Sequence, residues 1–178
     1  PLYIDIALMF YREDLLKKFS DYKDLKKQID ESITWEKFIE LGKRFEANKN
    51  PFYIFQADDY EGLICSFTEL MANLNNPIVD ANGHLTIDSP EGKKSLQLLV
   101  DLVNKYNVSP KSVVYLKENE SYRLFAKSNA VFIRSWPSMI DDDNEYLSDE
   151  IRSNLKMAPM PHLAGTKPGS VYGGWNLM

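Results

Sequence analysis

The sequence is poor in residues that cross-link proteins or bind metals. It contains one cysteine, Cys65, and two histidines, His84 and His162, among 178 residues. A disulfide within the chain and a zinc site built from several cysteines are therefore excluded. No apolar run approaches the roughly 18–20 residues of a membrane-spanning helix, so no transmembrane segment is expected. Acidic residues number 26 against 21 basic ones, so general electrostatic attraction to nucleic acid or anionic lipid is not expected.

The motifs of several enzyme classes are also missing. The sequence has no glycine-rich loop of the kind that binds phosphates or dinucleotides, and no Gly-x-Ser-x-Gly turn surrounds Ser135. Cys65 falls close to the apolar face of an expected helix, which favours a buried, inert thiol. The acidic run 141–143 lacks the alternating oxygens and the glycine of a calcium loop, which favours a solvated surface. We expect no metal and no cofactor.

What the sequence does contain is the pattern of one α/β domain. Apolar residues make up 44% of the chain, and its length is typical of one domain. Thr34 and Ser89 are good helix N-caps, each followed by apolar residues at helical spacing. Asn82-Gly83 between apolar flanks predicts a hairpin. Short strands are expected at 2–10, 52–55, 130–133, 156–160 and 171–178, and their alternation with helices favours a layered α/β fold.

Carboxylates cluster at the start of one expected helix. Asp58 and Glu61 have the spacing of a capping-box variant, which favours a helix start. An alternative is a carbohydrate-active hydrolase with Asp59 and Glu61 as acid and base. Two carboxylates this close on one helix start do not suit attack from opposite sides of a sugar bond.

Two tryptophans follow the ends of expected strands. Trp136 comes after the strand at 130–133, and Trp175 comes directly after Gly173-Gly174. Indole rings pack on the flat C–H faces of sugars, and glycines let a ligand approach the backbone. Each tryptophan alone is also consistent with a place in the core, as expected for Trp35 on its helix. Arg134 is expected either to share a strand face with Trp136 or to pair with acidic surface groups.

Ordered motifs over nearly the whole chain resemble one family, the extracellular solute-binding proteins of sugar-importing ABC transporters, of the maltose-binding type. The segments at 1–5 and 10–16 resemble the family's first crossing strand and the following helix. Thr-Trp-Glu at 34–36 is similar to a helix start of the family, and 125–136 to a helix–strand unit that ends in a ligand-stacking tryptophan. The segments at 158–161 and 173–175 resemble the return strand.

The resemblance implies a type II periplasmic-binding-protein fold, in which two α/β lobes enclose a sugar and close by hinge motion. We expect residues 1–178 to be one excised domain: a short mixed sheet flanked by helices, mainly the second lobe, between interlobe crossing strands at about 1–11 and 170–178. Seven ligand-binding residues are implied by the match: Trp136, Trp175, Gly173, Gly174, Tyr172, Tyr60 and Glu61.

The function implied is a non-enzymatic one. The chain is expected to bind a mono- or oligosaccharide and to serve a membrane permease, in the periplasm or outside the cell, with a lipid anchor on the full-length protein. The alternatives are the hydrolase fragment described above and a plain protein-interaction domain, in which Trp136 and Trp175 would be buried and far apart.

Overall fold

The computed structural model describes residues 2–45, 50–141 and 144–177. Predictions that involve Pro1, Asp142, Asp143 and Met178 therefore lie partly outside the described residues. The helices are α1 (Glu13–Leu16), α2 (Tyr22–Asp30), α3 (Trp35–Phe45), α4 (Glu61–Asn73), α5 (Pro90–Asn104), α6 (Glu118–Ser128) and α7 (Asp149–Asn154). The strands are β1 (Tyr3–Ile6), β2 (Leu8–Arg12), β3 (Tyr53–Ile54), β4 (Phe132–Ser135), β5 (Leu155–Ala158) and β6 (Tyr172–Trp175).

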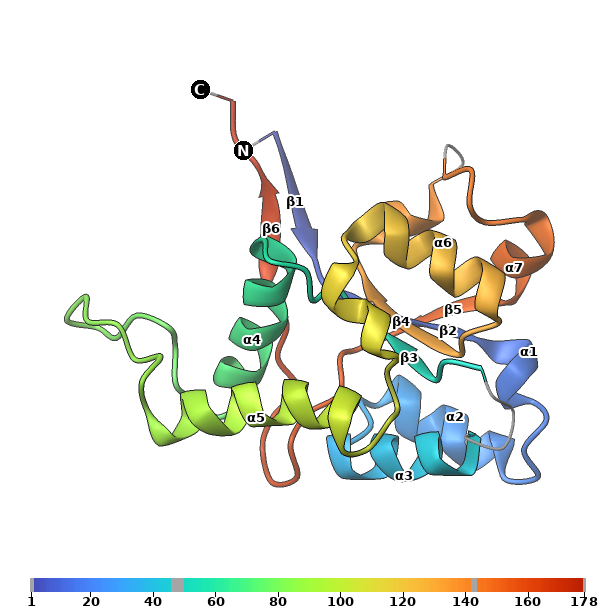
Figure 1. The fold of residues 1–178 in the computed structure, drawn as a ribbon, viewed down its shortest axis with the longest axis horizontal. Helices are drawn as coiled ribbons and strands as arrows, with labels where there is room; N and C mark the ends of the chain where they lie inside the picture. Colours follow the sequence, from blue (N-terminus) through green and yellow to red (C-terminus); the bar gives the residue numbers. More distant parts are fainter. Residues whose placement is uncertain (1, 46–49, 142–143, 178) are drawn as a thin grey trace.

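The strands form two separate sheets. The larger has the order β3-β4-β2-β5 and is mixed, because β2 is antiparallel to β4 and β5 whereas β3 is parallel to β4. In Figure 1, α6 and α7 lie above this sheet and α2 and α3 below it. The smaller sheet is an antiparallel pair, β1-β6, which stands apart from the larger sheet. We call this pair the ribbon.

Aromatic rings fill the space between α3 and the four-stranded sheet. Phe38 of α3 lies 4.9 Å from both Phe52 and Phe132, measured between ring centroids, with tilted or edge-on geometry. Trp35 contacts Phe38 edge-on at 5.5 Å and is 4% exposed, which confirms its expected place in the core. Such edge-to-face pairs add to the stabilisation that comes from burying the rings.

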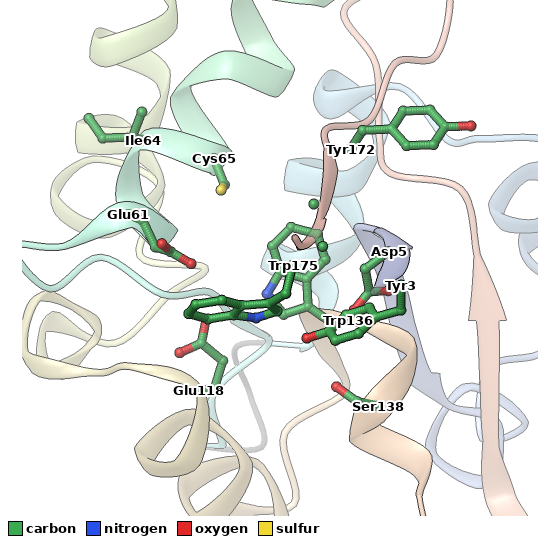
Figure 2. A pocket seen from close by; sticks show the side chains of 12 residues that line it. Tyr3, Asp5, Glu61, Ile64, Cys65, Glu118, Trp136, Ser138, Tyr172 and Trp175 are labelled. Carbon is green, nitrogen blue, oxygen red and sulfur yellow. The ribbon is translucent and has the colours of Figure 1, made fainter. Parts of the chain in front are cut away.

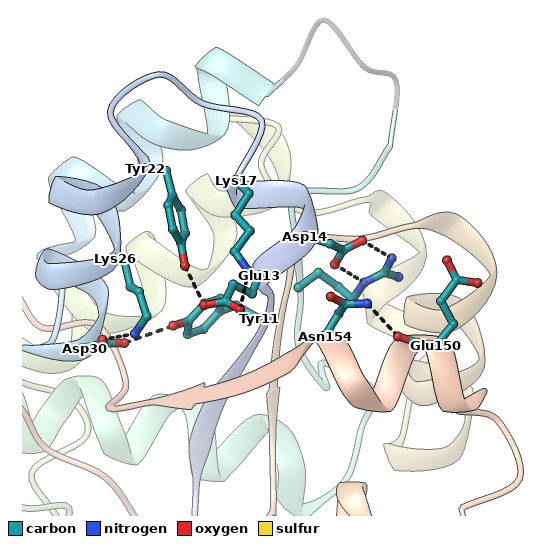
Figure 3. Close-up of polar contacts among 10 residues, drawn as sticks. Tyr11, Glu13, Asp14, Lys17, Tyr22, Lys26, Asp30, Glu150 and Asn154 are labelled. Carbon is teal, nitrogen blue, oxygen red and sulfur yellow. Dashed lines mark hydrogen bonds and ion pairs between the residues drawn. The ribbon is translucent and has the colours of Figure 1, made fainter.

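Polar contacts fasten the chain around α1 and α2, at the end of the sheet remote from the ribbon (Figures 1 and 3). Glu13 accepts hydrogen bonds from Tyr22 Oη (2.5 Å) and Lys17 Nζ (2.9 Å). Tyr11 Oη donates to Asp30 Oδ1 over 3.1 Å. These contacts connect α2 to the first turn of α1 and, through the buried Tyr11, to β2.

The expected strand at 2–10 is divided in two. The chain leaves the ribbon at Ala7, whose amide donates to Val171 O over 3.2 Å and whose carbonyl accepts from Ser170 Oγ over 2.5 Å. The residues before Ala7 pair with β6, and those after it pair with β4 and β5. A continuous apolar run thus serves two sheets, which its residue types alone did not reveal.

Two helix caps agree with prediction and one does not. Ser89 Oγ accepts from the Gly92 amide (3.0 Å) with Pro90 in the first turn, and Thr34 Oγ1 accepts from the Lys37 amide (3.4 Å). The prediction of a capping box formed by Asp58 and Glu61 is wrong. Helix α4 begins at Glu61, and Asp58 Oδ1 accepts a hydrogen bond from the neighbouring Asp59 amide instead. A tight turn, in which the amide of residue 60 donates to Asp58 O, places Glu61 first in the helix.

The other strand predictions were displaced or shortened, including 52–55, which is β3, and 156–160, which is β5. The strand expected at 130–133 is β4, two residues later, because pairing with β2 begins at Phe132 opposite Tyr11. The strand expected at 171–178 is the shorter β6. At Asn82-Gly83 the chain does turn, with Gly83 at φ 83°, but its flanks form a single bridge between Val79 and Leu85. Those flanks are exposed, so no packing extends them into strands.

Candidate functional site

The described residues enclose an open hollow of about 610 Å³ between the ribbon, α4 and the chain that follows β4 (Figure 2). Its volume falls in the range of small-molecule sites, which is about 300–1,000 Å³. Its walls come from segments that are far apart in the sequence.

The first wall is the ribbon. Cross-strand pairing sets Tyr3 opposite Trp175 and Asp5 opposite Gly173, and all four residues line the hollow. Trp175 is 66% exposed, so its indole is available to a ligand. Tyr172 also lines the hollow, but Figure 2 shows its ring pointing away from the other lining side chains.

The second wall is the first turns of α4. Glu61, Ile64 and Cys65 line the hollow, and the spacing of three and four residues places them on one helix face. Figure 2 shows the Glu61 carboxylate and the Cys65 thiol directed from α4 toward Trp175. Burial raises the pKa of the Cys65 thiol, which lowers its thiolate fraction. Cys65 is half-buried rather than buried, so the prediction of a buried thiol was wrong.

The third wall follows β4. Trp136 comes directly after the strand and is half-buried, Ser138 lies two residues later, and Glu118 begins α6. The buried strand thus positions an indole at its end while the ring remains at the surface of the hollow. This is the arrangement that makes element ends common binding positions.

Two glycines allow the ribbon to approach this wall. A Cβ atom on Gly173 would lie 3.0 Å from Cη2 and Cζ3 of Trp136. Gly174 has φ +131°, and a Cβ there would lie 2.3 Å from Tyr3 O. Neither position admits a side chain without movement, so the glycines bring the backbone against Trp136 and keep β1 and β6 paired.

The charge of the hollow is one-sided. Asp5, Glu61 and Glu118 contribute three carboxylates, and no lysine or arginine is among the described residues that line it. The groups around it are hydrogen-bonding acceptors and aromatic faces, a combination suited to hydroxyl donors and C–H faces. No cluster of three or more histidine, cysteine or acidic side chains able to hold a metal occurs in the described part of the chain.

The chain was compared with known proteins. No protein-family model matches it. It is 31% identical to a probable ABC transporter-binding protein of Deinococcus radiodurans, over 99% of this chain and 41% of that protein. MalE3 of T. maritima, solved with maltose bound, superposes with a TM-score of 0.84 at 33% identity, over 98% of this chain and 43% of that one. A solute-binding protein of Thermotoga lettingae, solved with α-D-tagatose, shares the fold with a TM-score of 0.82 at 24% identity.

Over nearly its whole length the chain matches one part of the solute-binding proteins of sugar ABC transporters. It spans about two fifths of the length of the relatives that it matches. The predicted family and the α/β fold with a mixed sheet and flanking helices are confirmed. The relatives that the chain matches are binding proteins rather than enzymes. Among its described residues, no helix combines the length and apolar character needed to cross a membrane.

The fold brings most of the predicted site residues to one hollow. Six of the seven predicted residues line it: Glu61, Trp136, Tyr172, Gly173, Gly174 and Trp175. Tyr60 is the exception and does not line it. It is the N-cap residue of α4, with its hydroxyl buried and its ring beneath Lys117 Nζ at 5.4 Å. Asp59, the other carboxylate of the hydrolase alternative, is exposed and also lies outside the lining. The roles of these residues in binding stay predictions.

Sequence reasoning missed several residues of the hollow. Tyr3 and Asp5 alternate along one strand and therefore share a face, but only the pairing with β6 sets them beside Trp175. Glu118 and Ser138 carry no local signal that distinguishes them from other surface residues. The interaction-domain alternative required both tryptophans to be buried and distant, whereas both line this hollow.

Proposed function

We propose that this chain is the sugar-binding second lobe of a solute-binding protein that feeds an ABC importer. The observation that carries the proposal is the hollow that contains both Trp136 and Trp175, together with relatives described as binding maltose and arabinooligosaccharide. The crossing strands at about 1–11 and 170–178 include the ribbon, which would connect this lobe to the other.

In this proposal the indoles of Trp136 and Trp175 stack on sugar rings. Glu61 accepts hydrogen bonds from hydroxyls, and Gly173 and Gly174 let the ligand approach the backbone. Tyr172 would contact the ligand after rotation of its ring. Tyr60, which lies outside the lining, would need a movement at the start of α4 to do so. The hollow is open to solvent on one side, which suits closure by a second lobe around the ligand.

The one-sided charge narrows the ligand class. A sugar with a carboxylate or a phosphate would meet Asp5, Glu61 and Glu118 without a lining cation to offset the repulsion. We therefore propose an uncharged mono- or oligosaccharide as the ligand. The closed protein would deliver it to a membrane permease from the periplasm or the cell exterior, with a lipid anchor holding the full-length protein near the membrane.

The test is a titration of the full-length protein with a panel of neutral mono- and oligosaccharides, monitored by tryptophan fluorescence. We expect at least one sugar to bind, Trp136→Ala to weaken it by about tenfold or more, and the matching uronic acid to bind more weakly than the neutral sugar. Tyr115→Ala is the control, because Tyr115 is 77% exposed and does not line the hollow. The proposal would be contradicted if no sugar of the panel changed the fluorescence and calorimetry detected no binding either.

A further inference from the structure

A buried arginine lies behind the tryptophan at the end of β4. Arg134 is 0% exposed and is the largest fully buried side chain among the described residues. Its Cζ atom lies 4.6 Å from the ring centroid of Trp136, in cation–π geometry. The ribbon backbone at Gly173 approaches the same indole near Cη2 and Cζ3, so Trp136 contacts both a guanidinium and the ribbon.

A carboxylate from α4 holds this arginine in place. Arg134 Nη2 donates to Glu69 Oε1 over 2.8 Å, and Glu69 is itself 5% exposed. Gln56, which is fully buried, donates from Nε2 to Arg134 O over 3.1 Å and lies 3.5 Å from Nη1 through Oε1. The guanidinium therefore has partners on two sides, and its plane is fixed relative to the indole.

Glu69 also reaches the ribbon end of the chain. Burial raises the pKa of Glu69, while Arg134 and the backbone amide of Val171 act to lower it. Val171 immediately precedes β6 and accepts the ribbon-side hydrogen bond from the Ala7 amide. One carboxylate thus connects α4, the arginine behind Trp136 and the segment that leads into Gly173 and Gly174.

Stability alone does not explain this pair. Removing two charges from water costs several kcal/mol per ion, and replacing a buried ion pair by apolar residues of similar volume is often neutral or stabilising. What apolar residues do not supply is a planar, hydrogen-bonded group that fixes the orientation of an aromatic ring. The position of the pair, behind a ring that lines the hollow, indicates where that orientation matters.

We propose that Arg134, held by Glu69, is a positioning residue that fixes the indole of Trp136 in the orientation needed to stack on the ligand. Arg134 does not line the hollow and acts only through Trp136. The inference rests on the proposed sugar-binding function, and it makes a separate claim about the ring in the ligand-free protein.

The test uses the full-length protein with the double substitution Arg134→Met, Glu69→Leu, which removes both charges and leaves no unpaired one. We expect this variant to fold with a melting temperature close to that of the parent and to bind sugar about tenfold more weakly. Arg134→Lys keeps the charge but not the planar group, and its affinity should lie between those of the double variant and the parent. The matched control is Arg12→Met, Asp14→Leu, which removes another ion pair, at the remote end of β2, and should leave affinity unchanged.

A second readout needs no ligand. In a protein that retains Trp136 and carries phenylalanine at its other tryptophan positions, including Trp35 and Trp175, the double substitution should change the emission and the acrylamide quenching of the remaining indole. A folded double variant with unchanged affinity and unchanged Trp136 emission would overturn the inference. If the parent protein binds no sugar, the proposed function fails, and the emission readout alone decides whether Arg134 positions the ring. If the double variant does not fold, Arg134→Lys decides by the same two readouts.

Discussion

The two sheets are built from similar aromatic and β-branched residues but have opposite surroundings. In β4 every residue is buried, including Phe132 and Ile133 at 0% exposure. In the ribbon, Tyr3 is 48% and Trp175 is 66% exposed. The four-stranded sheet is covered by helices and holds the fold together. The ribbon is held mainly by backbone pairing, and its rings are left available to a ligand.

This difference separates residues that stabilise from residues that bind. A ring in the covered sheet contributes through burial and close packing, so its loss leaves a cavity. The rings of Tyr172 and Trp175 on the ribbon contribute little to stability, since most of their surface is already in water. A two-stranded pair is marginally stable by itself, so the ribbon depends on Ala7, Ser170 and Val171, which join it to the rest of the chain.

The largest expected effect is a loss of stability in the four-stranded sheet. Phe132→Ala should lower the free energy of unfolding by about 3–5 kcal/mol, because the ring is fully buried among Phe38 and Phe52. Trp175→Ala should change it by about 0.5 kcal/mol or less while weakening sugar binding. Urea unfolding measures both variants. Equal losses in the two variants would show that the two sheets do not differ as described.

A smaller effect tests the backbone of the ribbon. Gly174→Ala introduces a Cβ at φ +131°, 2.3 Å from Tyr3 O, so ribbon pairing should weaken by about 1–3 kcal/mol. Hydrogen exchange of the Leu2 amide, which donates to Trp175 O, reports this opening. Gly165→Ala is the matched control, since Gly165 also has positive φ (+80°) but nothing within 4 Å of its Cβ position. Faster exchange in both variants alike would assign the effect to φ alone rather than to the close approach.

The smallest effect concerns the polar contacts at the remote end. Hydrogen bonds from Tyr22 and Lys17 hold the pKa of Glu13 below its ordinary value of 4.5. A carboxylate with a lowered pKa in the folded state stabilises the protein fully above the unfolded value and loses that contribution as pH falls through the folded value. Glu13→Gln should therefore lower stability by about 0.5–1 kcal/mol near pH 7.

Urea unfolding at several pH values checks this prediction. The difference between Glu13→Gln and the parent should shrink as the pH falls below 4.5, because the parent's Glu13 then becomes protonated as well. Glu31→Gln is a control, because it makes the same change in net charge at an exposed residue. A pH-independent difference would mean that lost packing, not the ionised carboxylate, accounts for the effect.

Local signals predicted the parts of the fold that depend on neighbouring residues. Ser89 with Pro90 and Thr34 before Trp35 each place a capping residue just ahead of a helix, and both caps are present. The predictions that failed needed information from elsewhere in the chain. Asp58 and Glu61 have capping spacing, but the turn before Glu61 decides where α4 begins.

For the site, sequence analysis selected aromatic residues and glycines at the ends of expected strands, and the family resemblance pointed to the same residues. These are Trp136, Gly173, Gly174 and Trp175. The sequence by itself determined the α/β class, the helix caps and these rings, because propensity and side-chain chemistry act over a few residues. Only the tertiary structure decided that Tyr3 and Asp5 face the same hollow and that Arg134 meets Glu69, 65 positions away. Strand register and the pairing of buried charges are set by packing between distant segments, and no local preference specifies which segments will meet.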